Sequence, residues 1–93
     1  MNKITLQFDK TKTALAGNPY GVKVFEEQVP EDFRIEDGIE IVFPDAIMLV
    51  ASSFVQGFFS KWSEMYGSDF LKENVRIVTN NEYVRNSILR DMP

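Results

Sequence analysis

Two adjacent serines, Ser52 and Ser53, are the side chains of this sequence best placed to take part in chemistry. They follow the apolar run 47–50 and precede a strongly amphipathic segment, 54–66, so we expect them at the start of a helix. The first turn of a helix carries unpaired backbone N–H groups and a partial positive charge. The pair is therefore predicted either to cap the helix or to form a switch that carries phosphate.

The two serines are expected to differ in role. Ser53 and Gln56 have capping-box spacing, in which the serine hydroxyl accepts from the Gln56 N–H and the glutamine side chain reaches back. Losing such a cap costs about 1 kcal/mol. Ser52 is then expected just outside the helix and exposed, where phosphorylation would add a charge of about −1.5 to −2. The alternative is that Ser52 is only a small residue in a tight turn.

Other catalytic or ligand-binding patterns are missing from the sequence. The chain of 93 residues contains neither histidine nor cysteine, which removes the usual catalytic bases, thiolates and disulfides. The Gly17–Gly21 spacing lacks the Lys-Ser/Thr of a phosphate-binding loop. Asp32, Glu36 and Asp37 lack the alternate-residue spacing of a calcium loop. We therefore expect no enzyme activity, no cofactor and no metal.

Acidic residues are concentrated in one part of the chain. Segment 26–45 holds eight acids and only Arg34 as a base, a charge of −7, within a chain of net charge −4. One interpretation is an ordinary solvated loop with its flanks. The other is an acidic surface for a basic partner protein, and the net charge argues against direct binding to nucleic acid. The candidate residues are Glu31, Asp32, Glu36 and Asp37.

The elements that must position these residues alternate between strand and helix. An α/β fold is therefore predicted, with a small mixed or mostly parallel sheet of about four strands and helices packed on it, in a single domain, 1–93. A strand, helix and strand at 39–43, 53–66 and 75–79 should form a parallel βαβ unit. The remaining expected elements are a strand at 3–8, a helix at 20–29 after Asn18-Pro19, an acidic loop at 31–38, a short strand at 47–50 and a final helix through Val84, Ile88 and Leu89. Thr79 and Glu82 have capping-box spacing at the start of that final helix.

The helix expected at 53–66 has one wide apolar face. At 100° per residue its aromatic and aliphatic side chains share one side, which predicts a core-facing helix, while Gln56 and Gly57 fall on the polar side. Gly67 is expected to end this helix. The residues expected in the core are Phe54, Val55, Phe58, Phe59, Trp62, Met65 and Tyr66.

Localisation follows from hydropathy and cysteine use. No apolar run approaches the ~18 residues of a membrane-spanning helix. The first residues alternate at once and show no apolar leader core. A cysteine-free chain of this kind is expected in the cytoplasm, with no contact to membranes.

The stretch from Val50 to Phe54, Val-Ala-Ser-Ser-Phe, follows a strand and opens an aromatic-rich helix. Together with Asn18-Pro19-Tyr20-Gly21 upstream, it resembles the STAS-like domain family of unknown function found in bacteria and phages, within the superfamily of anti-sigma-factor antagonists. The resemblance covers roughly Gly38–Met92 and, with the upstream helix, most of the chain. It implies a single STAS-like domain.

The resemblance also implies a function. In antagonists of this type the phosphorylated serine follows an aspartate and precedes Ser/Thr-Gly. That serine is Ser52 here, with Ala51 at the aspartate position and Phe54 at the glycine position. The implied function is a non-enzymatic regulatory protein–protein interaction module that binds an ATPase-type kinase. The alternatives are a phage or mobile-element inhibitor that binds a basic partner through segment 26–45, and a small nucleotide-binding protein.

Overall fold

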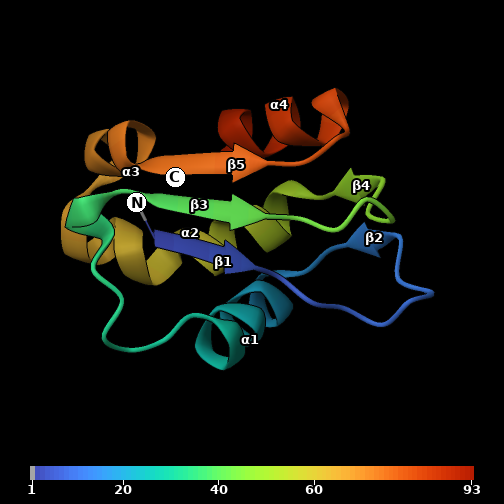
Figure 1. The fold of residues 1–93 in the computed structure, drawn as a ribbon, viewed down its shortest axis with the longest axis horizontal. Coiled ribbons are helices and arrows are strands. Elements are labelled where there is room, and N and C mark those ends of the chain that lie inside the picture. Colours follow the sequence, from blue (N-terminus) through green and yellow to red (C-terminus); the bar gives the residue numbers. More distant parts are fainter. Residues whose placement is uncertain (1) are drawn as a thin grey trace.

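Three parallel strands form the main sheet in the computed structural model, which describes residues 2–93 (Figure 1). Strands β1 (Asn2–Thr5), β3 (Ile39–Val42) and β5 (Val75–Val78) lie in the order β1-β3-β5, and both neighbouring pairs are parallel. A helix connects each pair, since two strands that run the same way need a crossover connection. The parallel unit predicted from segments 39–43, 53–66 and 75–79 is confirmed.

Within residues 2–93, four α-helices and one 3-10 helix accompany the strands. The helix predicted at 20–29 is present but begins at Asn18 and ends at Gln28, with Pro19 in its first turn and Val29 as its extended C-cap. Two short helices were not predicted, because a segment of two turns or fewer shows little periodicity in its sequence. The helices are α1 (Asn18–Gln28), η1 (Ile35–Asp37), α2 (Ser52–Tyr66), α3 (Ser68–Asn74) and α4 (Glu82–Asp91).

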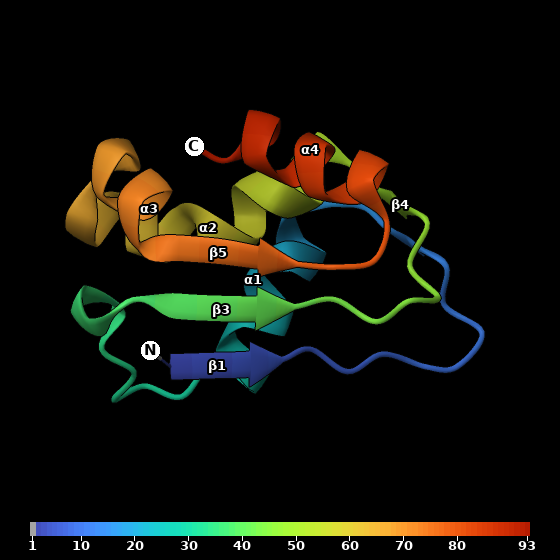
Figure 2. The same ribbon diagram turned by 45° about the horizontal axis from the view of Figure 1, so that its top comes forward.

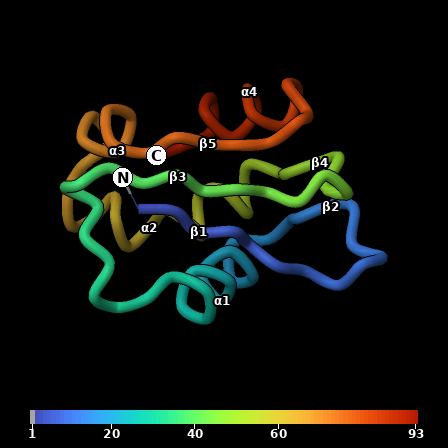
Figure 3. The backbone as a smooth tube through the Cα atoms, in the orientation of Figure 1, coloured from blue at the N-terminus to red at the C-terminus, as the bar shows by residue number. Residues whose placement is uncertain are grey.

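A second, two-stranded sheet lies beyond the carboxyl ends of β1 and β3. It pairs β2 (Ala14–Leu15) in parallel with β4 (Leu49–Val50). Figure 3 shows how the chain leaves β1 and β3, runs outward and returns through these two short strands. The single sheet of about four strands that was predicted is therefore replaced by one sheet of three strands and one of two. The reason is that the short strand predicted at 47–50 pairs with β2 instead of joining the main sheet.

One face of the main sheet is covered and the other is open. Ile4, Ile41 and Ile77 lie in register on the covered face and are buried beneath the helices. Lys3, Glu40 and Arg76 form the adjoining row on the opposite face. That row includes a weak Arg76–Glu40 ion pair of 3.9 Å. Figures 1 and 2 show α2 behind the strands, with α4 beside β5.

The crossing of α1 and α2 is unusually close. Gly21 of α1 and Gly57 of α2 are both buried there, and a Cβ atom on Gly57 would strike the backbone carbonyl of Asn18. The prediction that Gly57 lies on the polar, solvent-facing side of the helix was therefore wrong. Gly57 is buried at the crossing, because its lack of a side chain allows the two helix backbones to touch. Met65 was also misplaced, since 64% of it is exposed.

Of the other residues predicted in the core, Phe54, Val55, Phe58, Phe59 and Trp62 are buried as expected, whereas Tyr66 is only half-buried and packs against the core. Phe54, Phe58 and Phe59 are almost fully buried. The Trp62 and Phe25 rings pack edge to face with centroids 5.0 Å apart, in the geometry that aromatic pairs prefer. These aromatic contacts hold α1 on α2 and thereby fix where the ends of both helices lie.

Candidate functional site

The first turn of α2 places Ser52 at the surface. Ala51 is the N-cap, and its backbone N–H donates to Leu15 at 2.8 Å, which ties the helix start to β2. Ser52 is thus the first residue of the helix and lies within it, not just outside it as predicted. It is exposed, as predicted. The carbonyl of Ala51 accepts from residues 54 and 55, whereas the N–H groups of Ser52 and Ser53 have no acceptor within residues 2–93.

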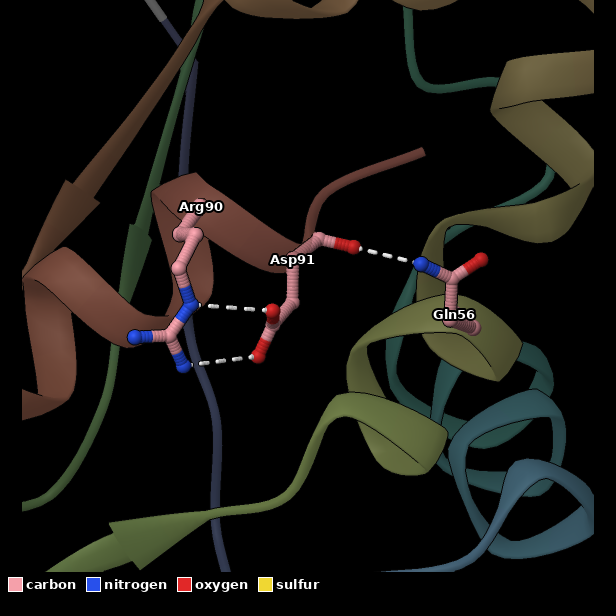
Figure 4. Close-up of polar contacts among 3 residues, drawn as sticks. All are labelled: Gln56, Arg90 and Asp91. Carbon is pink, nitrogen blue, oxygen red and sulfur yellow. Dashed lines mark hydrogen bonds and ion pairs between the residues drawn. The ribbon is translucent and has the colours of Figure 1, made fainter.

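The capping box predicted for Ser53 and Gln56 is wrong. The Ser53 hydroxyl accepts a 2.9 Å hydrogen bond from the Gly17 N–H, at the start of α1. The Gln56 side chain donates to the Asp91 carbonyl at 2.7 Å, at the end of α4 (Figure 4). Both partners are backbone groups at helix ends, which lack partners within their own helices. Ser53 and Gln56 therefore join α2 to α1 and to α4.

Exposed apolar side chains lie immediately before Ser52. Met48 is 59% exposed and Leu49 is 49% exposed, whereas the next residue, Val50, is buried. Single exposed apolar residues are common at protein surfaces. Here two consecutive ones precede Ser52 by four and three residues, just before an exposed hydroxyl and two unpaired N–H groups. We call Met48, Leu49 and Ser52 the serine end.

The acidic candidates lie at the opposite end of α2. Glu31 and Asp32 follow α1, whereas Glu36 and Asp37 belong to η1, and all four are exposed. The hydroxyl of Tyr66, the last residue of α2, donates to Glu36 across 3.4 Å. A helix of this length spans roughly 20 Å. The serines and the acidic residues therefore cannot form one site.

Tyr66 is neutral at physiological pH. Burial raises the pKa of its phenol above the ordinary value of 10.0, and the negative charge of Glu36 raises it further. The phenol thus remains a hydrogen-bond donor to Glu36 and holds η1 close to the end of α2. Its ring stacks on Phe70 of α3, with centroids 5.0 Å apart.

A cavity of about 390 Å³ opens beside the acidic residues, between the C-terminal parts of α1 and α2 and the loop that follows α1. Sequence reasoning missed it, because the aromatic residues of α2 were all assigned to the core. The sequence feature that could have indicated a pocket was the concentration of aromatic residues near the end of the predicted helix 53–66, in a chain with one strongly acidic segment. The lining residues are Phe25, Glu26, Val29, Pro30, Glu31, Phe33, Lys61, Trp62, Met65 and Tyr66.

Within residues 2–93, no group of three or more carboxylate, histidine or cysteine side chains is arranged to hold a metal ion. In the same range no helix has both the length and the apolar character needed to cross a bilayer.

Comparisons with known proteins give no relative. No model of a protein family matches the chain, and no curated protein or solved structure matches it significantly. The resemblance to STAS-like domains therefore stays a prediction from the sequence motifs. The function has to be argued from the geometry of the two ends of α2.

Proposed function

We propose that the protein is a cytoplasmic, non-enzymatic regulatory module of the STAS-like type that binds a partner protein through the serine end. The observation that carries this proposal is the position of the Ser52 hydroxyl. It is exposed, adjoins two unpaired backbone N–H groups and follows the exposed apolar side chains of Met48 and Leu49. The proposed partner surface combines this apolar contact area with a modifiable hydroxyl within five consecutive residues of the chain, 48–52.

Phosphorylation of Ser52 would act on this surface in two ways. The unpaired N–H groups and the positive end of the helix dipole would stabilise the phosphate. The same phosphate would place a charge of about −2 beside Met48 and Leu49, where a partner would have to desolvate it. The modified form is therefore expected to be stable and to bind its partner more weakly.

An ATPase-type serine kinase is the partner that the resemblance implies. The direct test incubates the protein with such a kinase encoded beside its gene and with ATP, and locates the phosphate by mass spectrometry. We expect modification of Ser52 and none of Ser68. Ser68 is a matched control, since it is an exposed serine at the first position of another helix, α3. Absence of phosphate on Ser52 would remove the switch from the proposal.

Binding measurements test the surface itself. Ser52→Asp should weaken binding of the kinase about tenfold or more, whereas Ser68→Asp should leave it unchanged. Leu49→Ser should also weaken binding, because it removes exposed apolar contact area. Leu89→Ser is the matched apolar control, because Leu89 of α4 is 42% exposed and lies beside the start of β5. Equal effects of Leu49→Ser and Leu89→Ser would contradict a partner surface at the serine end.

A further inference from the structure

The cavity at the C-terminal end of α2, here called the aromatic pocket, has walls from three separate segments. Its inner wall contains Phe25 of α1 and Trp62 of α2, which are 7% and 5% exposed. Half-buried Phe33 and Tyr66 stand at its sides, and exposed Met65 lies on its rim. Its volume of about 390 Å³ falls within the range of ligand pockets, roughly 300–1,000 Å³.

A free hydrogen-bond donor belongs to the inner wall. The indole N–H of Trp62 donates to no acceptor within residues 2–93, although only 5% of the residue is exposed. No polar side-chain atom of the described residues is both sealed from solvent and unpaired, so this N–H group keeps some contact with solvent. Buried tryptophans usually find a partner for this group. A bound molecule with a carbonyl oxygen would supply one.

The rim of the aromatic pocket is acidic. Glu26 and Glu31 line it together with one cation, Lys61, and all three are exposed, so the carboxylates outnumber the amine. A second hollow of about 340 Å³ shares Phe33 and Pro30 with the first. It adds two further acids, Asp32 and Asp37, and one base, Arg34. A pocket with an aromatic inner wall thus adjoins a surface of net negative charge.

We infer that the aromatic pocket binds one large apolar side chain of a partner protein, carried on a segment rich in lysine and arginine. The apolar side chain would fill the pocket, and a backbone carbonyl of the segment would accept from Trp62. The flanking cations would pair with Glu26, Glu31 and the acids beyond Phe33. This site lies at the end of α2 opposite Ser52 and does not depend on the function proposed for the serine end.

Charge selects this occupant over two others. The acidic rim would repel the phosphates of nucleic acids and the anionic surface of a membrane. A basic peptide meets opposite charge on the rim and apolar surface inside. Acidic segment 26–45, interpreted from sequence alone as a surface for a basic partner, would thereby gain an apolar anchor point.

Trp62 provides a direct measurement, because it is the sole tryptophan of the chain and lines the pocket. The probe is the peptide acetyl-Lys-Lys-Phe-Leu-Lys-Lys-amide, titrated while Trp62 emission is excited at 295 nm. We expect a saturable change in emission. Peptides with serine in place of Phe-Leu, or glutamate in place of the lysines, should bind about tenfold more weakly or not at all. Binding should also weaken at higher salt.

Two neighbouring glutamates of α1 give a matched pair of variants. Glu26→Gln should weaken binding of the peptide about tenfold, because Glu26 lines the pocket. Glu27→Gln makes the same charge change one residue away, at an exposed position outside the lining, and should have little effect. Both positions are exposed, so neither variant threatens the fold.

Three results would overturn this inference. The first is no saturable change in Trp62 emission with the basic peptide. The second is an equal effect of Glu26→Gln and Glu27→Gln, which would indicate unspecific attraction. The third is equally tight binding of phenethylamine alone, which would make the pocket a site for small amines. Ser52→Asp should leave peptide binding unchanged, so failure here and failure of the proposed function can be told apart.

Discussion

Replacing Gly57 by alanine should increase the helix propensity of α2 but disturb its packing on α1. Propensity alone predicts that alanine inside α2 stabilises the protein by about 0.8–1 kcal/mol. The structure predicts the opposite sign. A Cβ atom at Gly57 would strike the carbonyl oxygen of Asn18 and lie 2.8 Å from its carbonyl carbon. These are backbone atoms, so α1 itself has to move away.

The expected magnitude follows from these two opposing effects. Overpacking a close contact costs about 1–3 kcal/mol. A contact with rigid backbone belongs at the upper end of this range, because no side chain can rotate away. After the gain from propensity, we expect a net loss of about 1–2 kcal/mol in the free energy of unfolding. For a domain of this size that lowers Tm by about 4–16 °C.

The assay is urea unfolding, followed by circular dichroism at 222 nm and by the fluorescence of Trp62. Asn86→Ala in α4 is the control, since this side chain is exposed and alanine should add about 0.5 kcal/mol through propensity. The reasoning is refuted if Gly57→Ala leaves the urea midpoint unchanged or raises it. In that case α1 and α2 would not be in backbone contact at this position.

Two further predictions concern hydrogen bonds between side chains and backbone, and a third concerns a titration. Ser53→Ala should lower the free energy of unfolding by about 1 kcal/mol and speed amide exchange at Gly17, measured by NMR. Unchanged exchange at Gly17 would instead support Ser53 as a cap of its own helix. Gln28→Ala removes both 2.8 Å hydrogen bonds to the backbone of Gln7 and should lower the free energy of unfolding by about 1 kcal/mol. Amide exchange should become faster at Gln7 but not at the start of α1. The pKa of Tyr66 is raised in the folded state, so its contribution to stability is complete below its ordinary value of 10.0 and is lost as pH rises through the folded pKa. Absorbance at 295 nm against pH should therefore show one tyrosine ionising late, and its ionisation at the ordinary pKa would contradict the burial of the phenol.

Much of the fold follows from local patterns in the sequence. Alternation in segment 39–43 and the apolar face of 53–66 are visible without any structure, because each depends on the spacing of neighbouring residues. The capping box predicted from Thr79 and Glu82 at the last helix was wrong, because the structure has Asn81 as the N-cap, whose side chain accepts from the Val84 N–H at 3.1 Å. Strand β2 is only two residues long and exists only because β4 pairs with it.

The functional regions divide in the same way. Local sequence patterns were enough to predict that Ser52 is exposed near the start of a helix and that the acidic residues lie in a segment of their own. The helix packing was needed to show that Ser53 bonds to Gly17, that the backbones of α1 and α2 meet at Gly57, and that Trp62 lines a pocket with an acidic rim. Each of these facts depends on where a second helix passes. Local spacing determines which face of a helix is apolar, but the packing of α1 and α4 on α2 determines which groups come within bonding distance.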